Sequence, residues 1–155
     1  MKIYLLFIFQ LYALLSIGQL DTEVYVLLKK GTVIELANKI NLLERKTNKS
    51  NLYLGYVGAL KAKKSSYLKT PKQKAQEFKI GAGKIETAIE LDSKNVELIF
   101  LRYSIQCNSP KITRYKDKMA QDKFFLESQK KNIRESLYKI IQDFNSDHPE
   151  HKINL

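Results

Sequence analysis

Apolar residues recur at intervals of three and four along most of this chain, and this spacing restricts it to helices. The clearest stripe comprises Ala75, Phe78, Ala82, Ile85 and Ile89. Because an α-helix has 3.6 residues per turn, such residues share one face of a helix. No segment shows sustained apolar–polar alternation bounded by turn signals, which a half-buried strand would require. We therefore expect an all-α fold.

Two capping motifs mark where helices begin. In a capping box, a hydroxyl residue and a Glu or Gln three positions later hydrogen-bond each other's backbone amide groups. Thr32 and Glu35 form one such pair, and Thr70 and Gln73 form another, with Pro71 at the first helical position. Further breaks are expected at residue 31, at 92–95 and at 108–110. The sequence thus predicts helices that pair as hairpins, most clearly over residues 52–91.

The segment that follows residue 95 is apolar on two sides, so we expect it at the centre of the core. One stripe contains Val96, Phe100, Tyr103 and Cys107, and the other contains Leu98, Leu101 and Ile105. Cys107 is the single cysteine of the chain, so no intramolecular disulfide can form and packing must supply the stability. Its place on a stripe predicts a buried structural thiol rather than a nucleophile.

Residues 81–95 resemble a tetratricopeptide repeat. Gly81, Ile85 and Ala88 stand at the family's spacing of small, apolar and small residues, and Ser93 stands where the family usually has proline. The resemblance implies helical hairpins stacked as a short tetratricopeptide-like array. It also implies a concave surface that binds a protein or peptide, and it implies no catalytic residues.

The N-terminus has the pattern of a secretory signal peptide. Lys2 precedes an apolar run over 3–17, and the small residues Ser16 and Gly18 precede a polar stretch. The run is short for a hydrocarbon core of ~30 Å, which needs about 20 apolar residues. We expect a signal peptide at 1–18, a helical-repeat-like domain at 19–145, a polar and mobile C-terminal tail at 146–155, and a periplasmic or secreted protein. A retained membrane anchor and a buried N-terminal helix are the alternatives.

Positive charge is concentrated around one expected hairpin. The chain has a formal net charge of +11, and residues 61–79 contain seven lysines against Glu77 alone. Lys61, Lys64, Lys72 and Lys74 are therefore the candidate residues for binding an anionic partner, such as a component of the cell envelope. Export argues against nucleic acid as the partner. The alternative is that the cluster is a solvated edge without a ligand.

The residue patterns of common enzymes and metal sites are missing from the sequence. Residues 81–84 lack the other positions of a phosphate-binding loop, and we read their glycines as helix contacts. His148 and His151 have no third ligand beside them in the expected tail. Glu86 and Glu90 lie one helical turn apart, on what we expect to be a solvated face. We expect no catalytic residue, no metal and no cofactor.

Two functional hypotheses remain from these observations. The first is an exported helical-repeat protein that acts as a binding or scaffolding module for a protein or peptide. The second is a membrane-tethered cationic protein, in which an uncleaved N-terminal anchor holds the lysine-rich hairpin against anionic lipid or glycan. A hydrolase with an unrecognised site is a third and weaker hypothesis.

Overall fold

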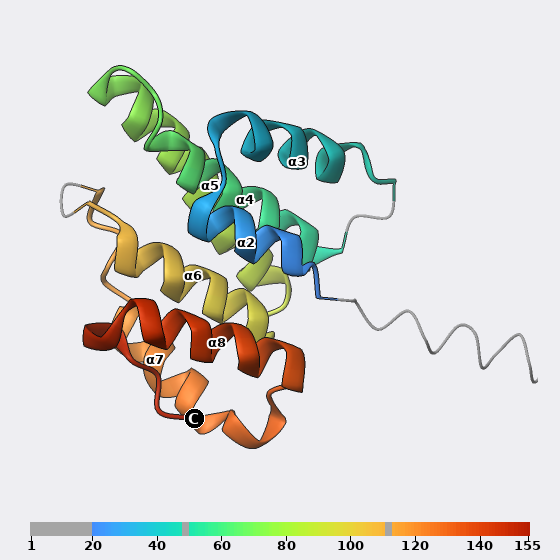
Figure 1. Ribbon diagram of the computed structural model, residues 1–155, viewed down its shortest axis with the longest axis vertical. Helices are drawn as coiled ribbons and strands as arrows, with labels where there is room; N and C mark the ends of the chain where they lie inside the picture. The colour runs from blue at the N-terminus through green and yellow to red at the C-terminus, as the bar shows by residue number, and fades with distance from the viewer. Residues whose placement is uncertain (1–19, 48–49, 111–112) are drawn as a thin grey trace, which may run out of the picture.

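The computed structural model describes residues 20–47, 50–110 and 113–155, and they form helices joined by short connections (Figure 1). Within these residues there is no strand, which confirms the all-α prediction. The expected signal segment lies outside the described residues. The helices are α2 (Thr22–Lys30), α3 (Val33–Arg45), α4 (Asn51–Ser65), α5 (Pro71–Leu91), α6 (Val96–Asn108), α7 (Met119–Ser128) and α8 (Glu135–Asp147), with 3-10 turns η2 (Lys130–Asn132) and η3 (Pro149–His151).

The helices stack as hairpins around α4, α5 and α6. Helices α4 and α5 form the most extensive contact, α2 and α3 pack on α4, and α6 packs on both α4 and α5. Figure 1 shows α7 and α8 beyond α6, on the side away from the α4–α5 hairpin. Phe144 of α8 meets Phe100 of α6 with ring centroids 5.6 Å apart. The expected arrangement of stacked helical hairpins is therefore present.

Side-chain caps begin the helices where the sequence predicts them. The Thr32 hydroxyl accepts from the Glu35 amide at 3.3 Å, and Glu35 accepts from the Thr32 amide at 2.8 Å. Thr70 and Gln73 make the same reciprocal pair, with both distances at 3.2 Å. Asn95 caps α6 by accepting from the amides of the second and third helical residues. Each cap satisfies amide groups that have no partner within the helix.

Glycines allow α4 and α5 to touch backbone to backbone. A Cβ placed on Gly81 would lie 2.5 Å from the Ala62 amide nitrogen and 2.6 Å from the Gly58 carbonyl oxygen. A Cβ on Gly58 would lie 2.7 Å from the Gly81 carbonyl oxygen. Such distances leave no room for a methyl group. Gly81, read from the sequence as a helix contact, has that role, whereas Gly83 faces open space and does not.

Helix α6 is buried on two sides, as expected. Phe100 and Tyr103 on one stripe are each 1% exposed, and Leu98 and Leu101 on the other are fully buried. Cys107 near the end of the helix is half-buried, and burial raises the pKa of its thiol to about 11. A thiol with so high a pKa is almost entirely protonated at neutral pH, which suits a structural residue.

The residues after α8 are packed onto the fold, so the expectation of a mobile tail is wrong. Ile153 is 0% exposed and belongs to the hydrophobic core. Asn145, the last residue before the expected tail, is a buried residue of α8 that hydrogen-bonds Ile153. Little in the sequence indicates this packing, because Ile153 and Leu155 are too few apolar residues to form a periodic pattern.

Candidate functional site

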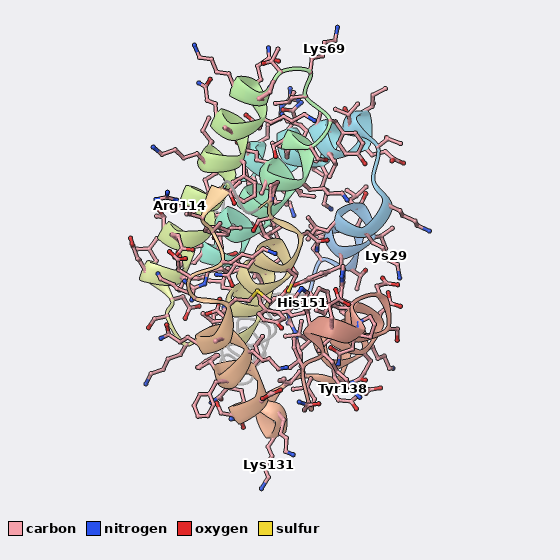
Figure 2. The ribbon with its side chains drawn as sticks, turned by 90° about the vertical axis from the view of Figure 1, so that its left-hand side faces the viewer. Lys29, Lys69, Arg114, Lys131, Tyr138 and His151 are labelled. Carbon is pink, nitrogen blue, oxygen red and sulfur yellow. The ribbon has the colours of Figure 1, made fainter. Side chains whose placement is uncertain are left out.

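The densest positive charge lies where α4 ends and α5 begins. We call Lys63, Lys69, Lys72, Lys74 and Lys79 the lysine tip. Lys69 projects from the end of the hairpin in Figure 2, and the last four of these side chains belong to exposed residues. Among the described residues, no carboxylate forms an ion pair with any of the five.

The four predicted lysines divide into two pairs in the structure. Lys61 Nζ lies 3.6 Å from Glu44 Oε1, and its side chain is 17% exposed. Lys64 Nζ lies 3.0 Å from Glu77 Oε1, and its side chain is 22% exposed. Lys72 and Lys74 lie in the first turns of α5 and are exposed. The fold thus pairs Lys61 and Lys64 with carboxylates and leaves Lys72 and Lys74 to solvent.

The charges of Lys72 and Lys74 oppose the dipole of their own helix. The N-terminal end of a helix carries a partial positive charge and favours acidic side chains. The first turn of α5 has none. Pro71 lacks an amide hydrogen, and the Gln73 amide is already bonded to Thr70. The lysine side chains are therefore the main groups that could bind an anion at this end.

A first buried polar network surrounds Glu97 at the start of α6. Its carboxylate accepts from Tyr25 at 2.9 Å, and also from Tyr56 and from Arg134, which precedes α8. Burial raises the pKa of Glu97, against the hydrogen bond from Tyr56 and the charge of Arg134. The network ties α2, α4, α6 and the start of α8 together. It is a structural cross-link, since donors from three parts of the fold meet at one buried carboxylate of a fourth.

A second buried network surrounds Arg102 in the middle of α6. The guanidinium donates to both Asp122 oxygens at 2.8 and 2.6 Å and to Glu86 at 2.8 Å. Glu86 also accepts from Tyr115 at 2.7 Å and from Lys118 at 3.1 Å. Burial raises the pKa of Asp122 despite its bonds to Arg102. The network joins α5, α6 and α7.

The expectation that Glu86 lies on a solvated face is wrong, because Glu86 belongs to this second network. Burial alone would raise the pKa of Glu86, but the hydrogen bond from Tyr115 and the charges of Arg102 and Lys118 lower it. One feature of the sequence does indicate buried polar networks: Glu97 and Arg102 interrupt a helix that is apolar on two sides. A charge in such a helix must find a partner inside the fold.

A groove of about 620 Å³ opens beside Glu97, between the starts of α4, α6 and α8. Its polar lining includes Ser50 and Asn95, whose side chains cap α4 and α6. The Asn95 side chain also donates to Asp92 at 2.8 Å. These two polar side chains of the groove thus hydrogen-bond within the fold.

The two histidines have structural contacts. The ring of His148 stacks on Phe144 at 4.6 Å, and the His151 carbonyl accepts from Tyr103 at 2.8 Å. Within residues 20–47, 50–110 and 113–155, no group of three or more His, Cys, Asp and Glu side chains is placed to hold a metal ion. In the same ranges no helix has the length and hydropathy needed to cross a membrane.

Comparison of the chain with protein-family models, with curated proteins and with solved structures found no match in any of the three. The resemblance to tetratricopeptide repeats therefore rests on the residues at 81–93 and stays a prediction.

Proposed function

We propose that this chain is an exported, non-catalytic helical module that binds an acidic segment of a partner protein through the lysine tip. The observation that carries the proposal is that Lys69, Lys72, Lys74 and Lys79 are exposed and without ion pairs to described carboxylates, in the α4–α5 connection and the first half of α5. Export is inferred from the residues at 1–18, and a protein partner from the tetratricopeptide resemblance.

Electrostatics favours an extended acidic partner over a single small anion. One exposed ion pair contributes only about 0.2–1 kcal/mol, so a single carboxylate would bind weakly. Several carboxylates along a flexible segment can engage several lysines, and the field of the tip speeds their encounter. Lysines are long and mobile, so they tolerate variation in the spacing of the partner's charges.

Anionic lipid is the alternative ligand, and the expected N-terminal apolar run is the observation that favours it. If that run is retained as an anchor, the lysine tip lies near a membrane surface. Each lysine would then contribute about 1 kcal/mol on a surface rich in anionic lipid. The intact mass of the protein from its native host separates the two readings: a chain that begins near residue 19 indicates cleavage.

The experiment measures binding to poly-L-glutamate, to vesicles with anionic headgroups and to neutral vesicles, each at low and high salt. We expect salt-sensitive binding to poly-L-glutamate, and its loss when the exposed residues Lys69, Lys72, Lys74 and Lys79 are all replaced by Glu. Circular dichroism checks that the variant keeps its helices. Binding that is unchanged in this variant, or no salt-sensitive binding to any polyanion, contradicts the proposal. Binding to anionic vesicles alone supports the membrane alternative.

A further inference from the structure

The residues that follow α8 lie against the fold in the way a bound peptide does. After α8 the chain passes through η3 and runs back beside α7 to its last described residue (Figure 1). Three helices contact this segment: Tyr103 of α6 donates to the His151 carbonyl, Glu127 of α7 accepts from Asn154, and Asn145 of α8 bonds Ile153. We call the surface formed by Tyr103, Glu127 and Asn145 the tail groove.

The side-chain amide of Asn145 hydrogen-bonds both the backbone amide and the backbone carbonyl of Ile153. The Ile153 amide donates to Asn145 Oδ1 at 2.8 Å, and Asn145 Nδ2 donates to the Ile153 carbonyl at 2.8 Å. A side-chain amide has one acceptor and one donor group, so it can pair with a peptide unit as a neighbouring strand would. This contact fixes an extended backbone and does not depend on the side chain of the residue that is bound.

The contacts around Ile153 and Asn154 determine which side chains the tail groove accepts. Ile153 is 0% exposed within the hydrophobic core, so the groove accepts a branched aliphatic residue there. The backbone amide and the side-chain amide of Asn154 both donate to Glu127 Oε1 at 2.9 Å. The next position therefore favours a side chain that donates a hydrogen bond.

The segment at 152–155 buries little apolar surface, although hydrogen bonds hold Ile153 and Asn154. Ile153 is its one fully buried residue, Lys152 and Asn154 are exposed, and Leu155 is half-buried. Segments with few buried apolar contacts open at a lower free energy than the core does. The covalent link to α8 keeps this weakly held segment bound, because a short connection gives the segment an effective concentration in the millimolar range.

From these contacts we infer that the tail groove is a binding site for an extended segment of another protein, and that residues 152–155 occupy it in cis until such a segment displaces them. The partner segment would carry an aliphatic residue in the place of Ile153, followed by a residue whose side chain donates a hydrogen bond. This site is separate from the lysine tip, and it does not depend on the function proposed there.

The test uses the full chain and a labelled peptide with the sequence of residues 150–155. Ile153→Asp removes the anchor in cis and leaves the groove residues in place. We expect this variant to bind the peptide about tenfold or more tightly than the wild-type chain does, because the cis segment no longer competes. A control peptide with aspartate at the Ile153 position should not bind, and adding Asn145→Ala to the variant should abolish binding. A folded variant that binds neither peptide, or both equally, overturns the inference.

Hydrogen exchange of the wild-type chain provides a second test that does not depend on how the variant folds. We expect the Ile153 amide to exchange about a hundredfold or more faster than the Leu101 amide, because the segment opens without unfolding α6. Equal protection of the two amides means that residues 152–155 unfold only with the core. That result overturns the inference, and it decides the question if Ile153→Asp does not fold.

Discussion

Arg102 connects three helices from the middle of α6. Its guanidinium bonds Asp122 of α7 and Glu86 of α5, and Asp122 is almost fully buried. Removing the arginine would leave the Asp122 carboxylate inside the fold without its charge partner. An uncompensated buried charge is among the most destabilising changes that a single substitution makes.

We predict that Arg102→Met lowers the free energy of unfolding by about 3–5 kcal/mol at pH 7. Part of this loss should be recovered at pH 5. Burial already raises the pKa of Asp122, and losing Arg102 raises it further. A carboxyl whose pKa is higher in the folded than in the unfolded chain stabilises the fold increasingly as the pH falls.

Urea denaturation of wild type and variant at both pH values measures this effect. Lys118→Met is the control, since Lys118 also bonds Glu86 but its side chain is 55% exposed. It should cost less than about 1 kcal/mol. An equal loss for Arg102→Met at the two pH values would show that Asp122 is not the group left uncompensated.

At the scale of elements, the α4–α5 hairpin allows a matched pair of glycine substitutions. Gly81→Ala should destabilise the protein by about 1–3 kcal/mol, because the new methyl group meets the backbone of Gly58 and Ala62. Gly83→Ala should stabilise it by about 0.5–1 kcal/mol, since Gly83 lies in the same helix with open space around its Cβ position. Chemical denaturation of both variants measures the two changes in the free energy of unfolding, which should have opposite signs. Equal effects would mean that the helices do not approach closely at Gly81.

The central position of α6 predicts a large effect of truncating its core residues. Phe100→Ala should lower the free energy of unfolding by about 3–5 kcal/mol, because Phe100 is buried and contacts the ring of Phe144. Val96→Ala, near the start of the same helix and half-buried, should cost less. An unchanged melting temperature for Phe100→Ala would show that α6 is not at the centre of the core.

Helices were predictable from the sequence because their signals are local. The stripe of α5 and the caps at Thr32 and Thr70 depend on residues within a few turns of one another. The pairings within the polar networks have no such local signal, because Glu97 and Arg102 meet partners 16 to 72 residues away. Likewise, nothing local indicates that Ile153 packs on the core.

The lysine tip, likewise, is only partly predictable from the sequence. The concentration of charge at 61–79 is visible in the sequence. Which lysines stay unpaired is set by where the chain places Glu44 and Glu77. Lys61 finds Glu44 on α3, a contact that no spacing within the hairpin predicts.

At the scale of the whole molecule, the helices form a scaffold that carries the lysine tip on the α4–α5 hairpin. Two buried networks and the glycine contact fix α4, α5 and α6 relative to one another, so the lysine tip is presented in a defined position. Charge at the start of α5 opposes the helix dipole, and the fold therefore gains nothing from Lys72 and Lys74 being there. The binding role that we propose would account for that placement.

The most direct test of this claim compares two double variants that remove the same charge. Lys72→Gln with Lys74→Gln takes two exposed lysines from the tip, and Lys61→Gln with Lys64→Gln takes two lysines that are paired within the fold. The account predicts that the first variant binds poly-L-glutamate at least about tenfold more weakly than wild type and is no less stable. The second variant should keep most of the binding and lose some stability. If both variants lose binding equally, only net charge matters and the lysine tip is not a site.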